Sequence, residues 1–290
     1  MDYFLHILIF MCVYMILALS YNLIIGTAGL FSMAHASFYG LGAYSVGLLM
    51  INYGLSFWLA IIFAFLAAGI ISLALAFPAI RVRGDYLILA SFGFQMIIVD
   101  IFRNWISFFG GPGGLPGIPP PKLFGVTISS LGSFFLMALG FTAVTVFIIL
   151  RINNSPLGLI LRAIKEDEVA VQAMGKDVVK AKTLAMCIGG ALGGVAGGIV
   201  ATYMSCIDPT MFSIHESIYI MTMVVLGGSG KWQGPLLGAF ILVALPEVLR
   251  FSGMPDRIAG PMHQVLYGAT LMVFMRFRPQ GILSGRHANN

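Results

Sequence analysis

The sequence predicts an all-α fold, a polytopic bundle of membrane-spanning helices in which some segments are broken by glycine. Hydrophobic residues make up 59% of the 290 positions and charged residues only 9%. A soluble domain carries roughly 25% charged residues, so this composition excludes a water-soluble fold. The apolar residues also gather in runs of bilayer length, and most basic residues fall in the short stretches between those runs.

Nine apolar segments are long enough, or nearly so, to cross a bilayer, and the pattern allows a range of eight to ten. The first runs without a cleavage signal into further apolar sequence, so we expect a retained span and not a signal peptide. The seventh is short and is followed by Gly227-Gly228-Ser229-Gly230, which predicts a broken or re-entrant element. The segments run from Tyr3 to Ile25, Phe31 to Ile51, Phe57 to Ile80, Tyr86 to Phe108, Val126 to Leu150, Leu184 to Cys206, Ile214 to Leu226, Leu236 to Leu249 and Ile258 to Phe277.

The distribution of basic residues predicts the orientation of these spans. Twelve of the sixteen Lys and Arg residues fall on one side of the membrane when nine spans alternate. Basic residues accumulate on the cytoplasmic side of membrane proteins, so we expect the C-terminus inside and the N-terminus outside. The same distribution accounts for the net charge of +5 without a nucleic-acid partner, because the bases do not gather on one face with aromatic residues.

Two connections between the apolar segments are unusual. Residues 110–121 are so rich in Gly and Pro that we expect an irregular external connection, neither helix nor regular strand. Residues 153–182 form the long polar stretch on the inner side, and they open with a helix-start signature at Ser155 and Pro156. Apolar residues then recur at helical spacing as far as Gly175, which predicts a short amphipathic helix or helix pair suited to dock into another protein's groove.

Glycine occurs in two kinds of pattern. Gly190, Gly194 and Gly198 fall four apart, and such a face lets helix backbones pack closely. Elsewhere glycine interrupts the apolar runs, once around His35 and again at 227–238. Transporters place such breaks near the middle of the membrane, where freed backbone groups can bind substrate. The first break is marked by Gly26, Gly29, Ser32, Gly40 and Gly42.

Polar side chains within membrane spans are costly, so each is a candidate for function. Two pairs are spaced three residues apart near predicted outer ends, Asp100 with Arg103 and Glu247 with Arg250. We expect each pair to form an ion pair across one helical turn. The other candidates are Asn22, His35 and Gln95.

Enzyme motifs are not found in the sequence. Residues 228–232 partly resemble a phosphate-binding loop, but they lack its leading glycine and have Trp232 where Ser or Thr would bind magnesium. No nucleophile motif and no cluster with metal-ligand spacing accompanies them. We therefore expect no catalytic residue and no metal site, and the energy for any transport must come from a partner or an ion gradient.

The motifs together resemble the permease subunits of branched-chain amino acid ABC transporters, of the LivM type. The matching stretches occur in order along nearly the whole chain, so their combination is far more specific than any one of them. They are residues 22–26, 29–32, 35–44, 81–86, 110–119, 161–168, 227–239 and 278–283.

The resemblance implies a multi-pass protein of the bacterial inner membrane that works in a larger assembly. Its partners would be a homologous second permease, two cytoplasmic ATP-binding subunits and an external solute-binding protein. No cofactor is expected in this chain, because ATP and magnesium would be used by the partner subunits. Residues 1–290 would form one permease domain, with 153–182 as the coupling segment. By similarity, its ATPase contacts are Arg162, Ala163, Lys165, Glu166, Asp167, Glu168 and Gly175.

The resemblance also implies transport by alternating access. A solute-binding protein would deliver an apolar amino acid at Gly111, Pro112, Gly114 and Pro116. Freed backbone at the glycine breaks would then contact the charged ends of the amino acid. We hypothesise that the substrate path is lined by Asn22, Ser32, His35, Phe38, Tyr44 and Gln95.

Two other functions stay open at this point. A related permease for urea, short amides or other amino acids would share these motifs, because affinity usually resides in the binding protein. A stand-alone carrier or channel driven by an ion gradient would instead transport its substrate without ATPase partners.

Overall fold

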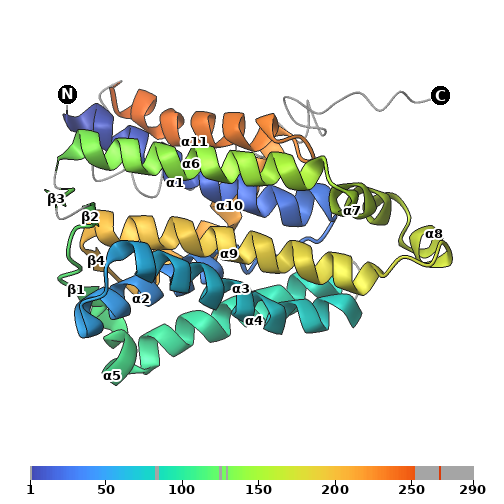
Figure 1. The fold of residues 1–290 in the computed structure, drawn as a ribbon, viewed down its shortest axis with the longest axis horizontal. Coiled ribbons are helices and arrows are strands. Elements are labelled where there is room, and N and C mark those ends of the chain that lie inside the picture. Colours follow the sequence, from blue (N-terminus) through green and yellow to red (C-terminus); the bar gives the residue numbers. More distant parts are fainter. Residues whose placement is uncertain (1, 82–84, 124–125, 129, 252–267, 269–290) are drawn as a thin grey trace.

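The computed structural model describes residues 2–81, 85–123, 126–128, 130–251 and 268 (Figure 1). Its long helices lie side by side, and its strands are two residues long each. The predicted all-α membrane bundle is confirmed. The helices are α1 (Asp2–Asn22), α2 (His35–Tyr53), α3 (Phe57–Arg81), α4 (Asp85–Asn104), α5 (Ile106–Phe109), α6 (Leu131–Asn153), α7 (Pro156–Glu166), α8 (Glu168–Ala173), α9 (Val178–Met204), α10 (Ile214–Gly227) and α11 (Gln233–Phe251).

Five described helices are long and apolar enough to cross a membrane. The shorter helices α10 and α11 are also apolar. The first eight predicted segments correspond to α1, α2, α3, α4, α6, α9, α10 and α11. The ninth, Ile258 to Phe277, lies outside the described residues, so the span count stays a prediction. The five candidate spans are Asp2–Thr27, Phe57–Phe77, Tyr86–Asn104, Leu131–Asn153 and Val178–Met204.

The predicted start of the fifth span was wrong. Val126 lies in β3 (Val126–Thr127), which pairs antiparallel with β2 (Lys122–Leu123) in a short hairpin. Helix α6 begins only after Ser130, whose side chain accepts a hydrogen bond from the Ser133 backbone N–H (3.2 Å). Serine favours this N-cap position because its hydroxyl satisfies one of the unpaired amides of the first turn.

Helix α9 begins at Val178 and not at Leu184 as predicted. Asp177 provides its N-cap, with its carboxylate accepting a hydrogen bond from the Lys180 backbone N–H (2.9 Å). The basic side chains of Lys180 and Lys182 interrupt the apolar pattern in the first turns. The apolar run therefore begins later than the helix itself.

Glycines let α9 pack closely at the centre of the bundle against α1, α2 and α3. A Cβ atom added at Gly194 would lie 2.5 Å from Ala68 Cβ in α3. One added at Gly197 would lie 1.9 Å from the Tyr39 carbonyl oxygen in α2. Neither distance is tolerable for real atoms, so these contacts require glycine. The close packing predicted from the glycine spacing is confirmed.

The first glycine break is shorter than predicted. Helix α1 ends in a π-helical turn, η1 (Leu23–Thr27), and residues 28–34 are irregular before α2 starts at His35. Gly40 and Gly42 lie inside α2 and do not interrupt it. Gly42 serves packing instead, because a Cβ atom there would lie 2.0 Å from the Gly194 carbonyl oxygen.

The connection at 110–121 is more ordered than predicted. It contains a 3-10 turn, η2 (Gly111–Gly113), and a short strand, β1 (Leu115–Pro116). Strand β1 pairs antiparallel with β4 (Cys206–Ile207), just before the 3-10 turn η3 (Pro209–Phe212). Figure 1 shows this end of the bundle, with the N-terminus, opposite the end that carries α7 and α8.

Candidate functional site

The two glycine breaks meet in space. Asn22 at the end of α1 is fully buried, and its Oδ1 accepts a hydrogen bond from the Gly230 backbone N–H between α10 and α11 (3.0 Å). A Cβ atom at Gly26 would lie 2.7 Å from that same Gly230 nitrogen. Glycine at position 26 therefore lets the second break approach the first, and the two breaks form one structural unit.

The N-terminus of α2 is capped by side chains from other helices. Its own N-cap residue, Ala34, provides no side-chain hydrogen bond. The Ala36 N–H donates to Ser217 Oγ from α10 (2.9 Å), and the Ser37 N–H donates to Gln95 Oε1 from α4 (2.8 Å). Backbone groups within a membrane must be satisfied by the protein itself, so these contacts stabilise a helix that begins inside the bundle.

Gln95 connects two segments that are far apart in the sequence. Besides accepting from Ser37, it donates through Nε2 to the Phe212 carbonyl oxygen in η3 (2.6 Å). Its neighbour one turn earlier, Ser91, accepts from the Met33 N–H (2.8 Å). Helix α4 thus fixes both the first break and the turn that leads into α10.

His35 lies at the start of α2 beside the end of α1. Its Nε2 is 2.8 Å from Ser20 Oγ, and its ring centroid is 5.1 Å from that of Tyr21. Tyr21 in turn donates to the Ser32 carbonyl oxygen (2.7 Å). The other ring nitrogen of His35, Nδ1, is buried without a hydrogen-bond partner among the described residues.

The structure gathers five of the six predicted path residues around the breaks. Asn22 holds the second break, whereas Ser32, His35, Phe38 and Gln95 surround the start of α2. Tyr44 lies apart, packed against Phe102, with ring centroids 4.4 Å apart. All six side chains are buried. Their contact with substrate stays a prediction.

The predicted amphipathic segment is a pair of helices, α7 and α8. Ser155 caps α7 through a hydrogen bond from the Gly158 N–H (3.4 Å), and Leu161 and Ile164 are buried on its inner face. Asp167 ends α7 and caps α8. Gly175 follows α8 with a φ of +74°, the left-handed conformation that glycine adopts after helix ends.

Four of the predicted ATPase contacts bind this chain itself: Asp167 caps α8, and three others contact residues outside their own helix. Arg162 donates to the Asn153 carbonyl oxygen (2.9 Å). Lys165 Nζ donates to the Gly26 carbonyl oxygen (3.0 Å). Glu168 forms an ion pair with Lys182 (2.8 Å), a buried lysine that the sequence patterns did not single out. Glu166 is exposed, Ala163 is half-buried, and both remain candidates for partner contact.

A cavity of about 430 Å³ lies between the first break and the coupling helices α7 and α8. Irregular backbone forms one part of its wall and charged side chains form another, so both parts of the candidate site border the same cavity. It is lined by Ala28, Gly29, Leu30, Phe31, Leu87, Ile164, Lys165, Glu166, Glu168 and Lys182.

Asp167 lies at the junction between α7 and α8, and removing its side chain has a measurable consequence. Its Oδ1 accepts from the backbone N–H groups of Val169 (2.9 Å) and Ala170 (3.0 Å). We expect Asp167→Ala to destabilise α8 by about 1 kcal/mol, the typical loss on removing an N-cap side chain. Hydrogen exchange of α8 measures this. Asp167→Asn is the control, because Asn caps equally well; equal exchange in both variants would contradict the capping role.

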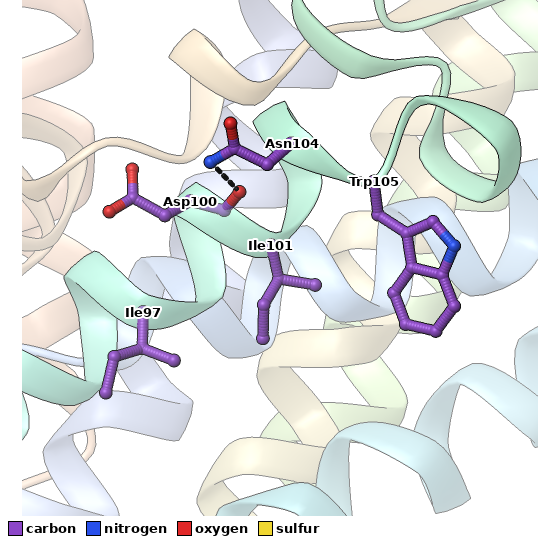
Figure 2. A pocket seen from close by; sticks show the side chains of 5 residues that line it. All are labelled: Ile97, Asp100, Ile101, Asn104 and Trp105. Carbon is purple, nitrogen blue, oxygen red and sulfur yellow. Dashed lines mark hydrogen bonds between the residues drawn. The ribbon is translucent and has the colours of Figure 1, made fainter.

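Another cavity, of about 510 Å³, lies on the outer part of α4. Figure 2 shows the Asp100 side chain directed away from that of Trp105, with Asn104 donating to the Asp100 carbonyl oxygen (2.9 Å). The predicted ion pair between Asp100 and Arg103 was wrong, since their charged groups form no salt bridge in the described chain. Both residues are exposed, and exposed pairs gain little free energy. The cavity is lined by Ile97, Asp100, Ile101, Asn104 and Trp105.

The second predicted ion pair has only one described side chain. Glu247 accepts a hydrogen bond from the Tyr3 hydroxyl, which joins α11 to the start of α1. The side chain of Arg250 lies outside the described residues. Pairing between Glu247 and Arg250 therefore stays a prediction.

The predicted binding-protein contacts divide into exposed and buried positions. Pro112 and Pro116 are exposed, whereas Gly111 and Gly114 are buried. Gly114 has a φ of +69°, and a Cβ atom there would lie 2.0 Å from the Ile207 carbonyl oxygen. The glycines shape the connection, and the prolines form its surface.

Sequence patterns missed the serines that cap other elements. Ser91 and Ser217 each stand alone in an apolar helix, and the sequence contains no periodic signal that marks a serine as a partner of a distant backbone amide. Only the packing of α4 and α10 on the first break gives them this role.

Interrupted apolar helices held together by buried polar side chains are typical of membrane transport proteins. Residues 3–275 match the family described as branched-chain amino acid transport system / permease component. The chain belongs to this family, and it is a multi-pass transport permease of LivM type and not an enzyme.

Individual relatives agree with the family. The chain is 32% identical to the high-affinity branched-chain amino acid transport system permease protein LivM of Escherichia coli, over 93% of this chain and 68% of the relative. It is 25% identical to the probable LivM permease of Methanocaldococcus jannaschii, over 96% and 92% respectively. It is also 25% identical to the Escherichia coli permease LivH, over 93% and 91%. No solved structure matches the chain.

Proposed function

We propose that this chain is the membrane-spanning subunit of an ATP-driven importer for branched-chain or similar apolar amino acids. The observation that carries the proposal is the family match over residues 3–275. The names of the relatives support the substrate class, because both LivM and LivH are named as permeases for branched-chain amino acids.

The proposed assembly contains a homologous second permease, two cytoplasmic ATP-binding subunits that use ATP and magnesium, and an external solute-binding protein. Similarity to both LivM and LivH supports a pairing of two related permeases. Apolar residues that are exposed on α3 and α4, such as Ile70 and Leu89, need lipid or a partner subunit to cover them.

We place the coupling segment in the cytoplasm of a bacterial cell and the connection at 110–121 outside the inner membrane. The bias of Lys and Arg toward one side supports this orientation. Figure 1 is consistent with it, because α7 and α8 lie at the end of the bundle opposite β1 and the N-terminus.

The proposed mechanism is alternating access between two packings of the same helices. In the described conformation the path residues are buried and the start of α2 is capped by Gln95 and Ser217. Substrate entry requires the breaks to separate, and separation frees backbone groups that can contact the ends of a zwitterionic amino acid.

Uptake into proteoliposomes tests this function. The chain is purified with its genomically adjacent ATPases, companion permease and binding protein, and uptake of labelled leucine is measured with competing isoleucine, valine and urea. We expect leucine uptake that requires both ATP and the binding protein. Uptake of urea alone would change the substrate but keep the mechanism, and uptake by the purified chain without ATPases would overturn the mechanism.

A further inference from the structure

Lys165 is an exposed residue of α7 whose ammonium group reaches back to the first glycine break. Its Nζ donates to the Gly26 carbonyl oxygen (3.0 Å), at the end of the π-helical turn. Its side chain crosses Gly29, where an added Cβ atom would lie 3.1 Å from Lys165 Cγ. Gly29 has a φ of +70°, so glycine is needed there for the backbone conformation as well as for the contact.

The Gly26 carbonyl oxygen is a favourable site for a cation. The last carbonyl groups of a helix have no partner within it and carry partial negative charge. Gly26 is buried, and a buried carbonyl group without a hydrogen-bond partner destabilises the fold. The Lys165 ammonium group satisfies this carbonyl group from a different helix.

The charged groups around Lys165 leave it free to make this contact. Glu168 and Lys182, which line the same cavity, form an ion pair with each other (2.8 Å). Glu166 is exposed at the end of α7. The Lys165 ammonium therefore binds the backbone of the break.

The Gly26 carbonyl group that accepts from Lys165 also lies close to the second break. A Cβ atom at Gly230 would lie 3.6 Å from the Gly26 carbonyl oxygen that accepts from Lys165. The Gly230 N–H donates to Asn22, the last residue of α1. A displacement of Lys165 therefore acts on both breaks at once.

We infer that Lys165 is the positioning residue that transmits movement of the coupling helix α7 to the two glycine breaks. When the ATPase subunits displace α7, the ammonium leaves the Gly26 carbonyl oxygen, the contact at Gly230 loosens, and the path around the start of α2 opens. This inference depends on the proposed function, because it requires that partner ATPases bind α7.

Coupling efficiency in the complete transporter tests the inference. The ratio of leucine imported to ATP hydrolysed is measured in proteoliposomes for the wild type, Lys165→Met and Lys165→Arg. We expect Lys165→Met to lower the ratio about tenfold, because it loses a charge-assisted hydrogen bond to the buried Gly26 carbonyl group. Lys165→Arg keeps a cationic donor and is expected to restore most of the ratio.

The matched control is Lys122→Met, which removes an exposed lysine at the opposite end of the bundle and should leave the ratio unchanged. An unchanged ratio in Lys165→Met would overturn the inference, as would a loss of uptake and hydrolysis in equal proportion, which indicates a general structural role. Wild-type complex that imports no substrate with ATP would instead refute the proposed function.

Hydrogen exchange of the wild-type complex provides a test that does not depend on any variant folding. With the ATPases trapped by an ATP analogue, we expect faster exchange at the Gly230 amide and along residues 26–31. Exchange that is the same with and without the analogue would overturn the inference.

Discussion

Replacing Gly197 with leucine is expected to prevent assembly of the bundle. A Cβ atom at this position would lie 1.9 Å from the Tyr39 carbonyl oxygen and 2.7 Å from the Ala43 nitrogen, so α2 and α9 must separate. Overpacking a core typically costs ~1–3 kcal/mol even where side chains can adjust, and here the obstacle is backbone. We expect almost no monodisperse protein on size exclusion in detergent, and a greatly lowered thermal unfolding temperature in what remains.

The matched control is Gly140→Leu in α6. Among the residues that the structure describes, no atom outside the helix lies within 4 Å of a Cβ added at Gly140, and the residue is exposed on an apolar helix. The two variants add the same side chain to a membrane-spanning helix and differ only in what surrounds it. Equal yield and equal unfolding temperature for both would refute the view that glycine is required where α9 contacts α2.

The glycine pattern of α9 shows how far the sequence can predict such packing. The spacing of Gly190, Gly194 and Gly198 is enough to predict a face that packs closely. It does not identify the helix on the other side, and it does not reveal that Gly197 faces α2 while Gly194 faces α3. That information depends on how three helices cross, which no local pattern contains.

Apolar length and capping residues predicted most of the fold, because each depends on residues that are close in the sequence. Long apolar runs predicted the helices, and Ser155 with Pro156 predicted the start of α7. The prediction failed at the start of α6, because the short hairpin of β2 and β3 precedes the helix and has no periodic sequence pattern. It also failed at α9, because Lys180 and Lys182 interrupt the apolar pattern in the first turns of the helix that Asp177 caps.

The candidate site could be predicted in its composition but not in its connections. The glycine breaks are predicted from glycines that interrupt apolar runs, and Asn22, His35 and Gln95 from the cost of polar side chains inside a membrane. The contact between Lys165 and Gly26 joins residues that are 139 positions apart, and the one between Asn22 and Gly230 joins residues 208 apart. Such contacts are set by tertiary packing, and no spacing rule predicts them.

Replacing Gln95 with methionine is expected to destabilise the start of α2 and the turn before α10 together. Methionine is similar in size and keeps the packing, but it cannot accept from the Ser37 N–H or donate to the Phe212 carbonyl oxygen. The Ser37 N–H then keeps only its longer bond to the Ala34 carbonyl oxygen (3.1 Å), and the Phe212 carbonyl oxygen loses its donor. A buried polar group left without a partner costs ~1–3 kcal/mol. We expect a lower unfolding temperature, and faster hydrogen exchange at Ser37 and in residues 209–213.

Ser45→Ala is the control for losing a side-chain hydrogen bond within α2, although Ser45 is half-buried and Gln95 is fully buried. Ser45 Oγ donates to the Leu41 carbonyl oxygen within α2 (2.6 Å), so its removal leaves the helix backbone intact. We expect Ser45→Ala to change the unfolding temperature little. If Gln95→Met did the same, water would have to reach the start of α2 in this conformation. The buried hydrogen bonds of Gln95 would then not be what holds the helix breaks closed.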